Sequence, residues 1–349
     1  MAMTLSARTA SGGTNTQTAR VDALFRDFNQ PGAPGASVMV IKDGKAVLAK
    51  GYGLANLEEK IPCDTNTNFR LASVTKQFTA MAVMILAERK KLSLDERLTD
   101  FFPEFPACGC PITVRHLLTH TSGLIEYEEV IPKGTEIPVL DRDVLRLLMQ
   151  QDKTCFPPGT KYHYSNSAYA LLALIVEARS GNTFARFLEE NIFRPLKMSH
   201  TLAYEQGLSA VPNRAYGYSL NAGGFKRTDQ SLTSSVLGDG GVYSSVADLY
   251  QWDQALYTDK LVSRKMLKLA FTPGPATDPP DTGYGFGWFV GHYRGLKEIW
   301  HSGNSLGFTT RIARFPEKKF TVIILTNRNE APIAEFPHRI ADWCLFPSD

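Results

Sequence analysis

Two side chains that can act together as a nucleophile and a base stand three positions apart near residue 75. In the stretch FRLASVTKQF, residues 69–78, Ser73 and Lys76 interrupt an otherwise apolar segment. On a helix, positions i and i+3 share a face, so the hydroxyl and the amine would be neighbours. An amine held among apolar side chains loses hydration of its charged form, which lowers its pKa and makes it a proton acceptor near neutrality. The pair predicts a serine nucleophile activated by a lysine.

A structural role fits the same spacing. Serine is a common helix N-cap, and lysine often buries its stem while its amine reaches water. The spacing alone therefore does not decide between catalysis and capping. Ser73-x-x-Lys76 is, however, the only S-x-x-K in the chain, which makes it a usable anchor for further comparison.

Two later segments carry further candidate groups. In YHYSNSAY, Tyr164 could relay protons and Asn166 could bind a substrate amide, although a capping cluster with Tyr164 at the core edge fits equally. In WHSGNSLGF, His301 would end a strand and Gly303 would allow a close backbone approach to a ligand. A half-buried histidine before a glycine turn is the alternative there.

A metal site is a competing interpretation. His116 and His120 are four residues apart in RHLLTH, a spacing that can place two imidazoles on one zinc ion. Leu117 follows His116, so the general-base glutamate of zinc hydrolases is missing at that position. We therefore expect no metal and no cofactor, and we keep a zinc hydrolase as the less favoured alternative.

Composition limits the classes of function. The 349 residues include 43% hydrophobic and 21% charged residues, with a net charge of +3, which excludes fibrous and wholly disordered classes and gives no sign of a nucleic-acid partner. A small molecule or short peptide is the expected substrate. No segment reaches ~18 consecutive apolar residues, so no membrane span is expected. The oligomeric state is not predictable from these features.

The N-terminal sequence and the cysteines bear on the cellular compartment. The first twenty residues are polar and lack the apolar stretch of a secretory signal, so the expectation is a cytoplasmic protein, or a periplasmic or secreted one if a leader has been removed. The five cysteines are scattered through a long chain, and no disulfide framework is assigned.

The elements that would position these groups follow an uneven pattern along the chain. Residues 18–29 show helical spacing, and residues 36–53 form two apolar runs joined at Asp43-Gly44, a strong hairpin signal. Helical patterns then dominate from residue 73 to about residue 257, and strand patterns return before a final helix at 331–346. Strands from both ends of the chain therefore predict one antiparallel sheet.

The three motifs in chain order are more specific than any one alone. Together with LLTHTSGL at 117–124 and GGVYSSVADLYQW at 240–252, they resemble the serine β-lactamase and penicillin-binding-protein superfamily. The likeness is to the branch with class C β-lactamases, D-alanyl-D-alanine carboxypeptidases, D-aminopeptidases and related esterases. It extends from about Asp22 to Leu345.

The resemblance implies an α+β fold of the β-lactamase/DD-peptidase type. An antiparallel sheet built from both termini and flanked by helices would carry an inserted, mainly helical domain. The expected division is a polar flexible tail at 1–20, a sheet domain at 21–72 and 240–349, and a helical domain at 73–239. The active site would lie in the cleft between the two domains, lined by the loops at 125–140 and 221–231.

The resemblance also implies roles for individual residues. Ser73 would be the acylated nucleophile, Lys76 its base or electrostatic partner, and Tyr164 the proton relay to the leaving group. Asn166 would hold the substrate amide. The backbone N–H groups of Ser73 and Asn304 would bind the oxyanion.

One departure from the family pattern concerns the third motif. Class C β-lactamases carry Lys-Thr-Gly where this chain has His301-Ser302-Gly303, so a permanent cation is replaced by a group expected to be half-charged near pH 6.5. We expect His301 and Gly303 to contact substrate, and β-lactam hydrolysis to be inefficient. The implied function is a serine hydrolase that forms an acyl-enzyme, either a D-alanyl-peptidase or D-aminopeptidase-like amidase or a carboxylesterase. A weak class C-like β-lactamase and a non-catalytic penicillin-binding sensor are the alternatives.

Overall fold

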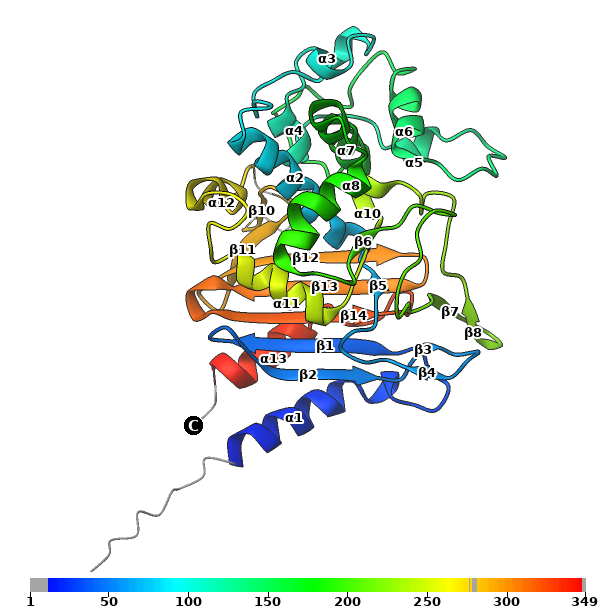
Figure 1. Cartoon of the computed structure of the whole chain (residues 1–349), viewed down its shortest axis with the longest axis vertical. Coiled ribbons are helices and arrows are strands. Elements are labelled where there is room, and N and C mark those ends of the chain that lie inside the picture. Colours follow the sequence, from blue (N-terminus) through cyan, green and yellow to red (C-terminus); the bar gives the residue numbers. More distant parts are fainter. Residues whose placement is uncertain (1–11, 276, 278–280, 347–349) are drawn as a thin grey trace, which may run out of the picture.

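The centre of the molecule is a seven-stranded antiparallel sheet to which both ends of the chain contribute. The computed structural model describes residues 12–275, 277 and 281–346. The strand order is β10-β11-β12-β13-β14-β1-β2, so two N-terminal strands lie beside five C-terminal ones (Figure 1). The strands are β1 (Ala36–Lys42), β2 (Lys45–Tyr52), β10 (Gly283–Tyr284), β11 (Phe289–Tyr293), β12 (Leu296–Ser305), β13 (Phe308–Phe315) and β14 (Phe320–Thr326).

The hairpin of β1 and β2 forms at the predicted turn. Asp43 and Gly44 have φ angles of 50° and 74°, the left-handed conformation that a tight two-residue hairpin needs at both central positions. Beside it, β1 pairs along its whole length with β14, with Ala36 opposite Thr326 and Lys42 opposite Phe320. This pairing joins the two ends of the chain.

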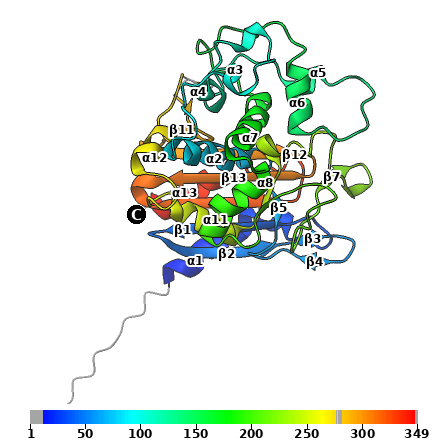
Figure 2. The same ribbon diagram turned by 45° about the horizontal axis from the view of Figure 1, so that its top comes forward.

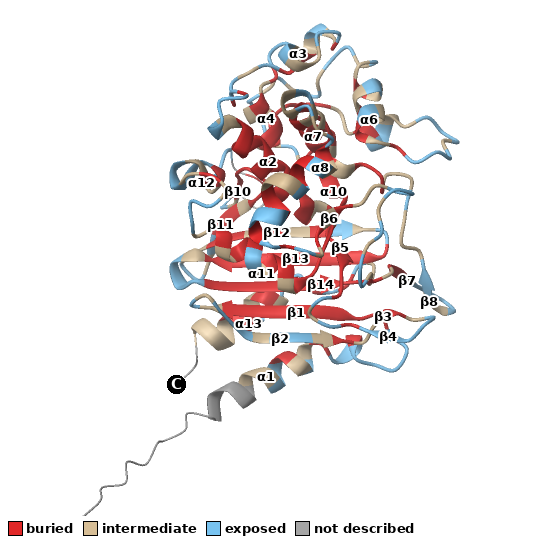
Figure 3. Cartoon of the chain, in the orientation of Figure 1, coloured by how far each residue is buried: buried red, intermediate tan, exposed pale blue. Residues whose placement is uncertain are grey.

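Both faces of the central strands are buried, which explains their nearly continuous apolar sequence (Figure 3). Along β1, Val38 and Val40 pack into a cluster with the terminal helices α1 (Gly12–Leu24) and α13 (Phe336–Leu345). Met39 and Ile41 point the other way, into the large core that includes the helices of the middle of the chain. Successive side chains on a strand alternate between faces, so one strand serves two cores.

The middle of the chain is mainly helical and lies on one side of the sheet (Figure 2). Its α-helices are α2 (Lys76–Glu88), α3 (Leu98–Phe101), α4 (Val114–Leu118), α5 (Tyr127–Val130), α6 (Asp141–Leu148), α7 (Asn166–Ser180), α8 (Phe184–Leu188), α9 (Arg194–Leu196), α10 (Leu237–Gly240), α11 (Val246–Ala255) and α12 (Arg264–Ala270). The helices of other types, some of them outside the middle of the chain, are the 3-10 helices η1 (Arg26–Phe28), η2 (Ala72–Thr75), η3 (Ala107–Gly109) and η5 (Pro316–Lys318) and the π-helix η4 (Glu189–Phe193). The helix α7 is followed by its C-cap, Gly181, whose φ of 72° is the left-handed conformation that glycine adopts readily.

Three small sheets that the sequence patterns do not predict complete the fold. They are β3 (Leu54–Asn56) with β4 (Ile61–Pro62), β5 (Phe69–Arg70) with β9 (Val242–Ser244) and β6 (Leu202–Ala203), and β7 (Tyr218–Asn221) with β8 (Gly224–Arg227). Strands of two to four residues are too short to show an alternating pattern. The β5–β9 pair matters for function because β5 leads directly into Ser73.

The expected fold class is confirmed, and one boundary differs. The helix α1 begins at Gly12, inside the segment predicted as a polar tail, and residues 1–11 of that tail lie outside the described residues. Contacts with α13 explain the longer helix, because Gln17 Nε2 donates to the Trp343 carbonyl at 3.2 Å and the Arg20 guanidinium lies over the Trp343 ring. A polar helix start stabilised by a distant segment shows no local apolar pattern.

Two further expectations concern the membrane and the cysteines. Within residues 12–275, 277 and 281–346, the helices are all too short or too polar to cross a bilayer. The five cysteines are free thiols, as expected from their scattered positions.

Candidate active site

The segment that carries Ser73 is held in a strained conformation. Ala72 has a φ of 48°, which is unfavourable for a residue with a side chain, and it immediately precedes Ser73 in η2. Gly303 of β12 packs against this segment so closely that a Cβ there would lie 2.1 Å from the Leu71 carbonyl oxygen. Thr310 Oγ1 also donates to that oxygen at 2.8 Å. The sheet therefore fixes the position of the serine.

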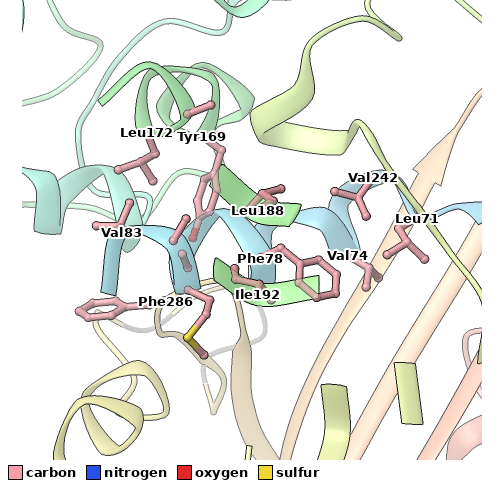
Figure 4. Close-up of a cluster of buried hydrophobic side chains, with 14 of the residues drawn as sticks. Leu71, Val74, Phe78, Val83, Tyr169, Leu172, Leu188, Ile192, Val242 and Phe286 are labelled. Carbon is pink, nitrogen blue, oxygen red and sulfur yellow. The ribbon is translucent and has the colours of Figure 1, made fainter. Parts of the chain in front are cut away.

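Lys76 occupies the first turn of α2 with its amine beside Ser73. Its Nζ is 3.1 Å from Ser73 Oγ and also donates to Asn166 Oδ1 at 2.8 Å and to the Asp239 carbonyl at 2.9 Å. The side chain is 0% exposed, whereas Ser73 is partly exposed. The helix continues into a core where Phe78 packs among apolar side chains that include Leu188 and Ile192 (Figure 4).

Burial lowers the pKa of Lys76 to about 8. The negative charges of Asp239, Glu126 and Glu128 act in the opposite direction but do not cancel the burial. Among the contacts of the described residues, none of these carboxylates forms an ion pair with the amine. At neutral pH an appreciable fraction of Lys76 is therefore uncharged and able to accept a proton.

Tyr164 lies on the other side of the same amine. The Lys76 Nζ is 4.8 Å from the centre of the Tyr164 ring, and the phenol hydrogen-bonds to Ser73. Burial raises the pKa of Tyr164 above its ordinary value, an effect that the bond to Ser73 only partly offsets. The tyrosine is thus a neutral phenol that can donate a proton, and Lys76 is the better candidate for the base.

Asn166 connects Lys76 to two carboxylates. Its Nδ2 donates to Glu128 Oε1 at 2.8 Å, and its backbone N–H donates to Glu126 Oε2 at 2.7 Å. Both ends of the side-chain amide are thus occupied by Lys76 and Glu128. A substrate amide that binds Asn166 must exchange with the Glu128 contact, which places the substrate next to Glu128.

A cavity of about 170 Å³ opens onto Ser73. Asn166 and Asn304 also line it, so three of the predicted residues meet at one space. The remaining lining residues are Arg70, Ala72, Tyr127, Glu128, Ser231, Thr233, Ser234, Asp239, Gly240, Ser305 and Leu306. These include members of both loops expected at the cleft, 125–140 and 221–231. An engineered cavity of roughly 150 Å³ takes one benzene molecule, so this space suits a small acyl group.

His301 lies behind this cavity and does not line it. Its side chain is 1% exposed, and Tyr284 Oη and His301 Nε2 are 2.9 Å apart. His301 Nδ1 is 2.7 Å from the Ser302 carbonyl, which can only accept, so Nδ1 carries the proton and Nε2 accepts from the tyrosine. Burial, and then the charge of Lys76, lower the pKa of His301 to about 3.

The expectation that His301 is half-charged near pH 6.5 is therefore wrong. It assumed an accessible ring, and the sequence does not reveal that this ring is buried. His301 is neutral throughout the physiological range. At Gly303, where a close backbone approach to a ligand is expected, the neighbouring atoms belong to the protein itself: a Cβ there would meet the Leu71 carbonyl oxygen, Thr310 Oγ1 and Ala72 Cβ.

His116 and His120 have partners of their own. The Thr113 backbone N–H donates to His116 Nδ1 at 3.2 Å, and the Ser165 backbone N–H donates to His120 Nδ1 at 3.0 Å. The His120 ring is 4.4 Å from the Tyr164 ring, so it braces the second motif. In the described part of the chain no three metal-ligating side chains form a cluster.

Several groups at the site were not predicted by the sequence. Arg70, Glu126, Glu128 and Asp239 either line the cavity or surround Lys76. Burial raises the pKa of Asp239 to about 6 and that of Glu126 to about 7. None of them belongs to a short motif, so only the fold reveals that they meet.

Comparisons with known proteins identify the family. Residues 21–342 match the family model described as Beta-lactamase. The chain is 31% identical over 325 residues to Penicillin-binding protein 4* of Bacillus subtilis, covering 89% of this chain and 72% of that protein. Relatives named Protein flp from Staphylococcus aureus are 28% identical, and the chain spans 64% of their length.

Solved structures of related proteins share the fold of this chain. An octameric penicillin-binding protein homologue from Pyrococcus abyssi superposes with a TM-score of 0.80 and 29% identity, covering 97% of this chain and 77% of that one. A D-amino acid amidase from Ochrobactrum anthropi SV3 also has a TM-score of 0.80, at 24% identity, covering 95% and 97% of the two chains. This chain therefore belongs to the Beta-lactamase family, within the serine β-lactamase and penicillin-binding-protein superfamily, and is a serine hydrolase.

Proposed function

We propose that this hydrolase cleaves amides or esters of small amino acids, in the manner of a D-aminopeptidase or amidase, through an acyl-enzyme on Ser73. The main observation in support of this reaction is that the Lys76 side chain is buried and that its Nζ lies 3.1 Å from Ser73 Oγ. The neutral amine accepts the serine proton while Oγ attacks the carbonyl carbon. The Tyr164 phenol, hydrogen-bonded to Ser73, passes its proton to the leaving group and regains one from the Lys76 ammonium. Water then attacks the acyl carbonyl carbon, which releases the acid and restores the Ser73 hydroxyl.

The oxyanion and the substrate amide have candidate partners in the cavity wall. Ser73 and Asn304 both line the cavity, so their backbone N–H groups are the proposed donors to the oxyanion. Asn166 is the proposed partner of the substrate amide. These roles follow the family pattern at matching positions in this chain.

The charges of the cavity support a substrate with a free amino group. Glu128 lines the cavity and is exposed, and Asp239 adds a second carboxylate to the wall. The position of the family lysine is taken by His301, whose low pKa leaves it uncharged. A substrate ammonium beside Glu128 gains a favourable charge interaction, whereas the carboxylate of a β-lactam finds no cation at position 301.

The proposal is tested with D-alanine p-nitroanilide and its N-acetyl derivative. The free amine should be hydrolysed at least about tenfold more efficiently, because a hydrogen bond between charged groups contributes roughly 1.5–3 kcal/mol. Intact-mass spectrometry should find the acyl adduct on Ser73, and Ser73→Ala should abolish turnover and the adduct while melting normally. Equal hydrolysis of both substrates would contradict the ammonium site. Full activity of Ser73→Ala would contradict the nucleophile.

A further inference from the structure

A buried arginine forms part of the cavity wall three residues before the nucleophile. Arg70 ends β5, where it pairs with Tyr243 of β9, and its side chain is 3% exposed. It lines the same cavity as Ser73. The short sheet thus fixes a permanent cation close to the reacting serine.

The guanidinium of Arg70 is only partly satisfied. Its Nη2 donates to the Ser234 carbonyl at 2.8 Å, but Nε and Nη1 are buried and find no acceptor among residues 12–275, 277 and 281–346. Among the described residues, no carboxylate forms an ion pair with Arg70. The buried carboxylate of the same wall, Asp239, accepts from the Tyr127 hydroxyl at 3.0 Å. The charge of Arg70 acts on Asp239 only at longer range, where it opposes the burial that raises the pKa of that carboxyl.

A buried cation without a counter-charge is unfavourable unless a ligand supplies one. Arg314 shows the usual arrangement in this molecule, because its Nε donates to Asp253 Oδ1 at 2.7 Å with both side chains 1% exposed. Arg70 has the burial of Arg314 without its carboxylate. The missing partner of Arg70 is an anion that can enter from the cavity.

Hydroxyl groups adjoin Arg70 in the wall. Ser231, Thr233 and Ser234 line the cavity, and the Ser231 and Ser234 hydroxyls are 3.1 Å apart. Hydroxyls can turn to donate to an anion, and a guanidinium binds a carboxylate through parallel N–H groups. Glu128, the proposed ammonium partner, lines the same cavity and carries the opposite charge.

We infer that Arg70 and the hydroxyls of residues 231–234 form a subsite for a carboxylate carried by the acyl group of the substrate. The favoured substrates are then amides or esters of acidic amino acids, with the α-ammonium at Glu128 and the side-chain carboxylate at Arg70. This inference rests on the proposed function and adds the substrate class. It concerns recognition and leaves the chemical steps unchanged.

The test compares two p-nitroanilides of matched shape, D-glutamyl and D-glutaminyl. The wild-type protein should favour the glutamyl substrate in kcat/KM by at least about tenfold, because only the glutamyl side chain brings a negative charge to the hydrogen bonds with Arg70. Arg70→Met should remove this selectivity, and Arg70→Lys should keep part of it. The matched control is Arg142→Met, at an exposed arginine outside the cavity, and it should keep all of the selectivity. Equal use of both substrates by the wild type, or selectivity unchanged in Arg70→Met, overturns the subsite.

A second measurement separates this subsite from the proposed reaction. The α-amides of D-glutamate and D-glutamine are used to protect Ser73 from labelling by a fluorophosphonate, which requires no turnover. Stronger protection by the glutamate amide that is lost in Arg70→Met supports the subsite. It does so even if neither p-nitroanilide is hydrolysed, because the lack of hydrolysis overturns only the proposed function. Equal protection by the two amides overturns the subsite. If Arg70→Met does not fold, the wild-type comparison and Arg70→Lys decide in the same way.

Discussion

Lys76 and Arg314 are both buried cations, and they differ in what surrounds the charge. Arg314 lies between the sheet and α11, where Asp253 Oδ1 accepts both from its Nε and from Thr321 Oγ1. Lys76 donates to a serine hydroxyl, an amide oxygen and a backbone carbonyl, and its carboxylate neighbours act only at longer range. Both side chains are almost completely buried, but only Arg314 forms an ion pair with another described residue.

The difference separates a structural cation from a reactive one. A paired and buried charge is held in place, and removing its partner is strongly destabilising. A buried amine with neutral acceptors stays close to losing its proton, which is the property that a general base needs. In this fold the buried cation at the sheet, Arg314, forms an ion pair with a carboxylate, whereas the buried amine beside the cavity, Lys76, has only neutral acceptors among the described residues.

The largest expected effect is on catalysis at Lys76. Lys76→Met should lower kcat by about 10²–10⁴-fold, the range that general acid–base catalysis contributes. Lys76→Arg is the matched variant, because it keeps a charge that cannot be lost near neutrality, and it should be similarly inactive. Steady-state kinetics measure both. An active Lys76→Arg protein would show that the charge, and not proton transfer, is what matters there.

Asp253→Asn is the converse change at the paired site. Leaving Arg314 buried without its counter-charge should lower the free energy of unfolding by about 3–5 kcal/mol. Activity of the remaining folded protein should stay near that of the wild type, because Asp253 does not line the cavity. Urea unfolding and kinetics on the same sample provide the test. Unchanged stability would mean that pairing does not distinguish the two cations.

The pH profile gives a smaller, graded effect. The pKa of Lys76 is lowered to about 8, so the neutral amine increases as the pH rises towards and through that value. With an ester substrate that carries no amino group, we expect kcat/KM to rise up to tenfold per pH unit below about 8 and then to level off. His301, with a pKa of about 3, should add no limb between pH 5 and 7. A flat profile from pH 6 to 9 would be inconsistent with an amine base.

Local signals explain how much of this arrangement the sequence could predict. The Asp43-Gly44 turn, the apolar runs of the strands and the spacing of Ser73 and Lys76 all act over a few residues. These patterns predicted one antiparallel sheet and placed the candidate nucleophile and base together, whereas the type of fold came from the resemblance to a known family. The polar start of α1 was missed because its contacts are with α13, at the other end of the chain.

The environment of the site depends on contacts that no short pattern records. Arg70 meets Ser234, and Lys76 meets Asn166, across 164 and 90 residues of chain. Burial of His301 could not be predicted either, although it decides the charge of the third motif. The sequence motifs therefore identify candidate site residues, whereas the charge states of those residues depend on burial and contacts that only the folded structure shows.

The most direct test is the pKa of the Lys76 amine in the folded protein. A nuclear magnetic resonance titration of lysine labelled at Cε, with Lys76→Met to identify the signal, measures it. We expect one lysine signal with a titration midpoint near pH 8, and this signal should be absent from Lys76→Met. A titration in which every lysine, including Lys76, keeps its proton to about pH 10 would contradict the account.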